Sequence, residues 1–115
     1  MIPLEEQKIF EEGIHLFNSG KHYESHEEFE SLWLSASGSK KLFLQVLILL
    51  AAVEVHKANS RFDTAQRVLS KIKKKLDELE DINLFHLTRN HLLVLHEQSC
   101  LGKTLVIPYM EPDQF

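Results

Sequence analysis

A histidine followed by glutamates one and four residues later is the part of this chain best suited to chemistry. The segment reads His26-Glu27-x-x-Glu30. An imidazole and a carboxylate four residues apart share one side of a helix, where they can bind one divalent metal ion. His26 and Glu30 would be the first two metal ligands. A third protein ligand is needed, and the candidates are His22, Glu27 and His56. In an enzyme, the metal would activate water and Glu27 or Glu30 would be the catalytic base.

The same segment carries aromatic side chains. On a helical wheel Glu30 lies about 40° to one side of His26, while Trp33 and Phe29 lie about 20° and 60° to the other side. Because aromatic side chains are usually buried and buried unpaired charges are costly, we expect a buried His/Glu cluster with partners. Three roles are open. The pair can be a structural anchor, bonded to each other, to backbone or to Trp33 Nε1; it can bind a metal or small ligand; or it can supply an acid and a base.

Other reactive side chains give weaker signals. The segment matches neither the zinc motif His-Glu-x-x-His nor the motif of di-iron bundles, in which a histidine follows a glutamate by three residues. His86, His91 and His96 are each rotated by about 140° from the one before, so they share no ligand face. Cys100 lacks the histidine and asparagine arrangement of a nucleophile. Nucleotide-binding loops, the hydrolase Gly-x-Ser-x-Gly motif and Cys-x-x-Cys are absent.

Composition indicates one globular domain. The chain has 115 residues, 43% of them hydrophobic and 26% charged, with a net charge of −4. This charge gives no basis for nucleic-acid binding. The single Cys100 and the acidic N-terminus, which lacks a signal-peptide pattern, favour a cytoplasmic protein. The longest apolar run, residues 42–53, is shorter than the roughly 20 residues that cross a bilayer, so we expect no membrane partner.

The hydrophobic pattern predicts an all-α fold of five helices, built from antiparallel hairpins. Gly13, on the apolar face of the first helix, indicates close approach of a neighbouring helix. The third helix is apolar nearly all round and should be central. It places Gln45 and His56 on one stripe and Glu54 on the opposite side. We expect helices over residues 4–18, 22–34, 40–58, 62–80 and 84–99, one domain over residues 1–104, and an extended tail over residues 105–115 that packs on or near it.

A short internal echo suggests a helical-repeat arrangement. The segment from Asn18 to Tyr23 before the second helix resembles the segment from Asn59 to Phe62 before the fourth. The first hairpin is also similar to a tetratricopeptide-type hairpin, a fold that presents a groove to a peptide. An interaction module with a peptide or protein partner, in which the His/Glu motif is purely structural, is therefore the alternative function. A homodimer through the fourth helix or the apolar tail is a further expectation.

The chain resembles the small bacterial and archaeal all-helical proteins grouped as domain of unknown function three-zero-nine. The resemblance covers about residues 10 to 76. It rests on Phe17-Asn18-x-Gly20, on Glu24-x-His26-Glu27-x-x-Glu30-x-x-Trp33, and on Gln45 with the apolar run through Ala51-Ala52 to His56 and Ala65.

This resemblance implies a compact helical array and leaves the activity open, because none is established for the family. The family positions it carries over are Glu24, His26, Glu27, Glu30, Trp33, Gln45 and His56. The chain departs from the family pattern at His22, usually aromatic; at Leu49, often a second glutamine; and at Ser60-Arg61, typically Gly-Asn. Our leading hypothesis is a protein of uncharacterised activity with a ligand or divalent metal site at His26, Glu30 and His56.

Overall fold

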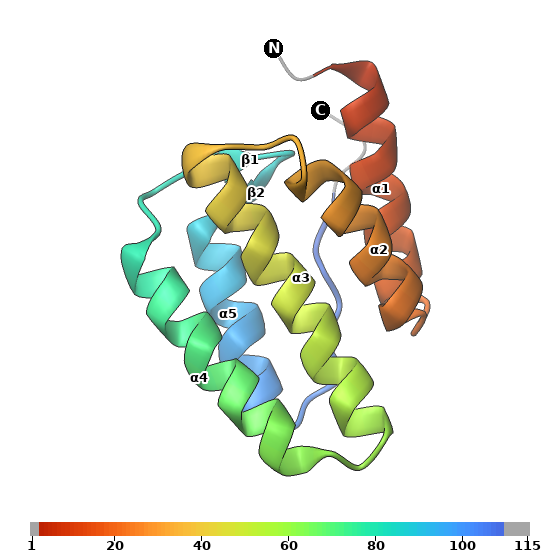
Figure 1. The fold of residues 1–115 in the computed structure, drawn as a ribbon, viewed down its shortest axis with the longest axis vertical. Coiled ribbons are helices and arrows are strands. Elements are labelled where there is room, and N and C mark those ends of the chain that lie inside the picture. Colours follow the sequence, from red (N-terminus) through yellow and green to blue (C-terminus); the bar gives the residue numbers. More distant parts are fainter. Residues whose placement is uncertain (1–2, 110–115) are drawn as a thin grey trace.

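A computed structural model describes residues 3–109 and confirms the all-α prediction (Figure 1). Five helices form in that part of the chain, and a two-stranded hairpin connects the fourth helix to the fifth. No helix among the described residues has the length and apolarity needed to cross a membrane. The elements are α1 Leu4–Asn18, α2 His22–Trp33, α3 Gly38–Ala58, α4 Phe62–Glu78, β1 Asn83–Leu84, β2 Leu87–Thr88 and α5 Arg89–Cys100.

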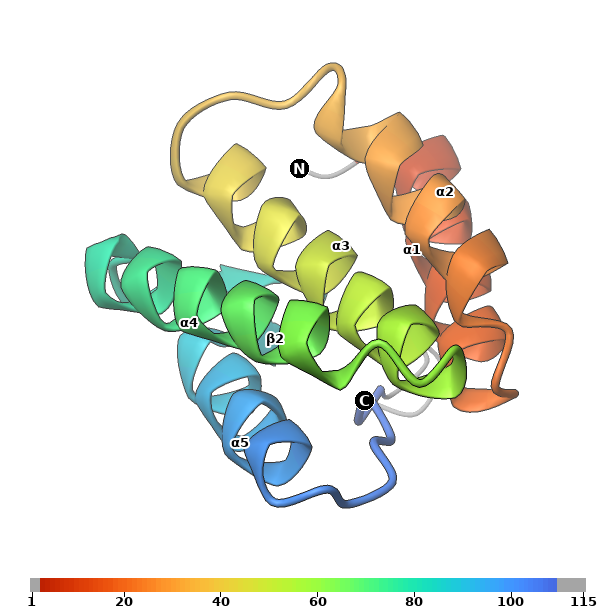
Figure 2. The same ribbon diagram turned by 60° about the horizontal axis from the view of Figure 1, so that its bottom comes forward.

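Helix α3 is central, as its apolar sequence predicts. Consecutive helices pack on each other, α1 on α2, α2 on α3 and α3 on α4, and α5 contacts both α3 and α4. Figure 2 shows α3 between the α1–α2 pair and the α4–α5 pair. Because neighbouring helices cover α3 on several sides, it needs apolar residues around most of its circumference and not only along one stripe. Among the fully enclosed side chains are Phe43, Leu44, Leu47 and Leu50.

The turns of the two helical hairpins have the same backbone conformation, forty positions apart. Gly20 and Ser60 both have positive φ, 82° and 58°. The residues after them, Lys21 and Arg61, have φ/ψ of −92°/66° and −93°/66°. The Lys21 amide donates to the Leu16 carbonyl at 2.9 Å, and the Arg61 amide donates to the His56 carbonyl at 2.8 Å. The echo in the sequence thus marks a repeated hairpin geometry.

Helices α1 and α2 approach each other closely at Gly13, as predicted. A Cβ atom added at Gly13 would lie 2.5 Å from Cε1 of the buried Phe29 ring. Beside this contact the buried Ser25 hydroxyl donates to the Gly13 carbonyl at 2.7 Å. A glycine on one helix and a small hydroxyl on the other therefore allow the two backbones to come together.

The predicted start of the fifth helix is wrong. Residues 83–88 form an antiparallel hairpin, and α5 begins only at Arg89. The two residues at the hairpin tip, Phe85 and His86, have positive φ of 52° and 67°. Phe85 is buried and stacks on Phe10 of α1 with ring centroids 4.1 Å apart, a contact that favours this conformation. A capping box between Thr88 and His91, the third residue of the helix, then starts α5.

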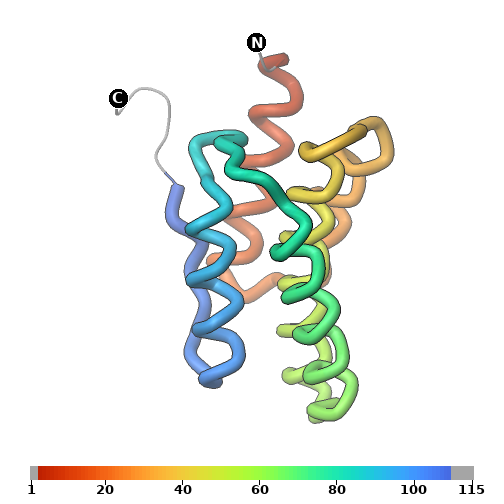
Figure 3. Tube along the Cα trace, turned by 90° about the vertical axis from the view of Figure 1, so that its left-hand side faces the viewer, coloured from red at the N-terminus to blue at the C-terminus, as the bar shows by residue number. Residues whose placement is uncertain are grey.

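The tail packs back on the domain along α1. Figure 3 shows this segment beside α5 in the view from the side. Leu105 and Ile107 are buried, and the Asn18 amide bonds both the carbonyl and the amide of Ile107, at 3.0 and 2.8 Å. Residues 110–115 of the predicted tail lie outside the described residues.

The apolar seam of α4 faces inward within one chain, and so do Leu105 and Ile107 at the start of the tail, whereas Val106 is 60% exposed. Self-association through either surface stays a prediction. The buried residues of the α4 seam are Ala65, Leu69, Ile72 and Leu76.

Candidate functional site

The central pair of the predicted site lies near the surface of α2. His26 Nε2 is 3.6 Å from Glu30 Oε2, and the two side chains are 28% and 48% exposed. The expectation of a buried His/Glu cluster is therefore wrong. The pair is a partly solvated contact, which contributes little to stability.

The reason lies in the phase of the helix. The buried residues of α2 are Ser25, Phe29 and Leu32, whose mean direction on the wheel is about 90° away from His26. The sequence prediction centred the apolar face on Trp33 and the other aromatic residues instead. Tyr23, another aromatic residue of this helix, is 60% exposed.

Two ring nitrogens predicted to be satisfied have no partner. His26 Nδ1 and Trp33 Nε1 are both shielded from solvent, and neither makes a hydrogen bond within the described residues. The Trp33 ring is partly buried against the edge of the hydrophobic core. The Lys41 ammonium lies 4.3 Å from the centroid of this ring. The described part of the structure therefore does not contain the predicted hydrogen bond from Trp33 Nε1 that would anchor the helix. A shielded ring nitrogen without a hydrogen bond lowers stability, and a ligand or a water molecule usually supplies the missing partner.

The remaining motif glutamates lie on the solvated side of α2. Glu24 and Glu27 are exposed. The Tyr23 hydroxyl forms a hydrogen bond with Glu27, which together with the nearby negative charge raises the pKa of Tyr23. Gln45 is half-buried near the start of α3, roughly 16 Å along the helix from His56. None of these three side chains lines the groove that contains both His26 and His56, although Glu27 lines a separate hollow with His26 and Glu30.

His26 and His56 line one groove between α2 and α3, about 250 Å³ in volume, together with Tyr23, Ala52, Val55 and Arg61. Glu30, the third residue of the predicted ligand site, is not among the residues that line this groove. Arg61 Nε donates to His56 Nδ1 at 3.1 Å. This bond places the proton of a neutral His56 on Nε2. We name this site the α2–α3 groove.

Arg61 is a groove residue that sequence reasoning missed. In the sequence it stands out only as a departure from the family pattern. The usable signal was the repeat, because Arg61 stands where Lys21 stands in the first hairpin and follows the same positive-φ turn. That turn directs the chain back toward the last turn of α3, where the Arg61 amide and side chain both bond to His56.

The described residues do not supply a complete protein metal site. No three His, Cys, Asp or Glu side chains between residues 3 and 109 converge on one point. His26 and Glu30 offer two ligands, while His22 lines a different cavity and His56 is bonded to Arg61 through Nδ1. A resident divalent ion would need its other ligands from water or from a bound molecule.

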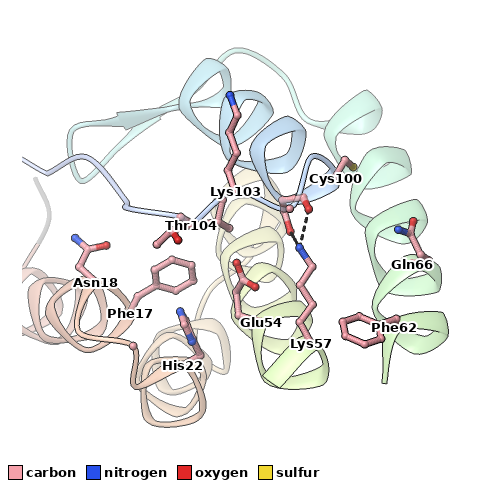
Figure 4. A pocket seen from close by; sticks show the side chains of 14 residues that line it. Phe17, Asn18, His22, Glu54, Lys57, Phe62, Gln66, Cys100, Lys103 and Thr104 are labelled. Carbon is pink, nitrogen blue, oxygen red and sulfur yellow. Dashed lines mark hydrogen bonds between the residues drawn. The ribbon is translucent and has the colours of Figure 1, made fainter. Parts of the chain in front are cut away.

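A second, larger cavity opens at the end of the bundle where both hairpin turns meet α5 (Figure 4). Its volume is about 620 Å³. Glu54 lines it, in agreement with the prediction that this side chain points away from His56. Burial raises the pKa of Glu54 and lowers the pKa of His22, which also lines the cavity. We name this site the turn cavity.

The family model described as Domain of unknown function (DUF309) matches residues 10–68, just over half of the chain. No curated protein and no solved structure matches the chain. The matched range contains α2 and α3 entirely and both hairpin turns. All side chains of the α2–α3 groove lie within it.

Proposed function

We propose that this chain, which belongs to the family described as Domain of unknown function (DUF309), binds a small organic anion in the α2–α3 groove. One observation carries the proposal: His26 and His56, thirty positions apart, line the same groove with the guanidinium of Arg61. Imidazole and guanidinium groups that converge on one groove form a donor set for carboxylate or phosphate.

The protonation pattern of His56 supports an acceptor-bearing ligand. Since Nδ1 accepts the bond from Arg61, a neutral His56 has its N–H at Nε2. Arg61 has further N–H donors beyond the one given to His56. The anionic group would be held by these donors, and His26 would contribute from the opposite helix.

The groove walls also provide an apolar surface. Ala52 and Val55 lie on α3 between the two histidines, and the Tyr23 ring stacks near His26 with centroids 6.3 Å apart. Ala52 is small, so it leaves room that a leucine would fill. The ligand class that fits both features is an anion attached to a flat or apolar body.

Phenyl phosphate is a suitable probe because it joins a phosphate to an aromatic ring. We expect saturable shifts of the His26 and His56 ring signals in NMR titrations. Arg61→Ala should weaken binding about tenfold or more, the effect of losing a charge-assisted bond. The matched control is Arg67→Ala, since Arg67 is exposed on α4, donates to the Thr64 hydroxyl and lies outside the groove. Equal loss in both variants, or no shift at the two histidines, would contradict the proposal.

A divalent metal at His26 and Glu30 is the competing ligand. Metal analysis of purified protein distinguishes the two, comparing the native sequence with His26→Ala and checking the fold in parallel. Stoichiometric metal lost in the variant would favour the ion. Metal-free protein that still binds phenyl phosphate would favour the organic anion.

Partner binding is a second candidate function, favoured by the exposed side of α2. Tyr23 and Leu34 are 60% and 68% exposed there, beside Glu27 and Glu30. Large apolar side chains flanked by acids suit a second protein surface better than solvent. Light scattering after size-exclusion chromatography tests self-association through this face. A dimer that Leu34→Lys converts to a monomer would support it, and a monomer at all concentrations would exclude the homodimer.

A further inference from the structure

The turn cavity is built from corresponding positions of the two repeated hairpins. Phe17 and His22 flank the first turn, and Lys57 and Phe62 occupy the same positions forty residues later. Figure 4 shows these side chains on opposite sides of the cavity, with Glu54 between them. The repeat therefore places two sets of side chains around one space, and α5 and the start of the tail close it.

Glu54 and Lys57 carry opposite charges one helical turn apart but are not paired. The Lys57 ammonium donates to the Ser99 carbonyl at 2.6 Å and to the Ser99 hydroxyl at 3.1 Å (Figure 4). Ser99 thus holds Lys57 against α5, and the Glu54 carboxylate has no hydrogen bond or ion pair within the described residues. An ammonium has three donors, so one donor of Lys57 remains beyond the two that Ser99 accepts.

An aromatic side chain at the edge of the cavity is largely exposed. Phe62 is 60% exposed although it lines the cavity. On the other side, the rings of Phe17 and His22 meet edge to face with centroids 4.7 Å apart. Burial lowers the pKa of His22, which favours a neutral imidazole there. The two charged groups therefore lie between aromatic surfaces.

We propose that the turn cavity binds a small zwitterion with an aromatic body. The ammonium of the ligand pairs with Glu54, its carboxylate pairs with Lys57, and its ring packs against Phe62. A ligand with both charges pairs with Glu54 and with Lys57 and leaves the bonds of Lys57 to Ser99 in place. This second site is separate from the α2–α3 groove, with which it shares no lining residue.

Burial is consistent with this assignment. Desolvation raises the pKa of Glu54, and the attraction of Lys57, which lowers it, is the smaller effect. A half-buried carboxylate without a partner is unfavourable, and a cationic group on a ligand would remove that cost. A cavity of about 620 Å³ has room for an amino acid with an aromatic side chain.

Three probes of similar size test the proposal by calorimetric titration. L-phenylalanine carries both charges, phenethylamine lacks the carboxylate, and phenylpropionate lacks the ammonium. We expect L-phenylalanine to bind about tenfold more tightly than either analogue, since each charge pair adds to affinity. Equal affinities for the three probes, or no binding of L-phenylalanine, would overturn the proposal.

Two variants assign the contacts. Glu54→Gln should remove the preference for L-phenylalanine over phenylpropionate, and Phe62→Ala should weaken all three probes. Glu97→Gln is the matched control, an exposed glutamate on α5 outside the cavity. Undiminished preference in Glu54→Gln would contradict the assignment. Arg61→Ala, which tests the groove, should leave L-phenylalanine binding unchanged, so the two proposals can fail independently.

Discussion

Replacing Gly13 by alanine tests how closely α1 and α2 pack. Two effects oppose each other. Alanine is favoured over glycine inside a helix by about 1 kcal/mol. The new methyl group would, however, lie 2.5, 2.9 and 3.0 Å from three carbons of the Phe29 ring. Overpacking of a core by one methyl group costs typically about 1–3 kcal/mol.

The upper part of that range applies because neighbouring side chains enclose the Phe29 ring and limit how far it can shift. It is completely buried, and the Phe10 ring lies behind it with centroids 5.6 Å apart. We therefore expect Gly13→Ala to lower the free energy of unfolding by about 1–2 kcal/mol net. The corresponding fall in melting temperature is roughly 4–8 °C for a domain of this size.

Urea unfolding followed by circular dichroism measures the change, with Glu12→Ala as the exposed neighbour control. That control should change stability by less than about 0.5 kcal/mol. In the Phe29→Leu background the clash is relieved, so Gly13→Ala should become neutral or stabilising, a coupling of about 1–3 kcal/mol. A Gly13→Ala variant as stable as the native protein, or one whose loss persists in the Phe29→Leu background, would refute the packing argument.

Three further outcomes follow from the turns, the tail and the turn cavity. Ser60→Gly should raise the free energy of unfolding by about 0.5–1 kcal/mol in urea titrations, because Ser60 has the positive φ that glycine adopts freely. Asn18→Ala should lower it by about 1–2 kcal/mol and speed hydrogen exchange at the Ile107 amide, whose partner it removes. The pKa of Glu54 is raised in the fold above its unfolded value, so the native state holds the proton more tightly and stability falls as pH rises from about 4.5 through the folded pKa. Glu54→Gln should remove that fall, as thermal unfolding across this pH range will show.

The helices were predictable because most of them form from local pattern. Four of the five predicted helices begin and end within two residues of the observed bounds. The hairpin at 83–88 was missed because its determinant is not local. Phe85 and His86 adopt positive φ, although neither is a glycine that would indicate such a turn in the sequence. The stacking of Phe85 on Phe10 joins residues seventy-five positions apart.

The candidate site was predictable in part. Wheel positions placed His26 and His56 toward a shared interface, and they do line one groove. The predicted depth of the motif is wrong because Tyr23 and Trp33 do not lie on the buried face of α2. The buried face consists of Ser25, Phe29 and Leu32, and the small Ser25 lets α1 approach and donates to the Gly13 carbonyl. Residue size alone does not reveal which side of a short helix meets its neighbour.

The last turns of α3 serve both proposed sites at once. Glu54 and His56 are two residues apart and therefore about 160° apart on the helix, so one faces the turn cavity and the other the α2–α3 groove. Lys57 follows on α3 and lines the cavity, and Arg61, in the turn after α3, lines the groove. A central helix with neighbours on several sides can present polar groups only where those neighbours end. The repeated turns create such a place, which explains why Glu54, His56 and Lys57 can be polar at this end of the helix.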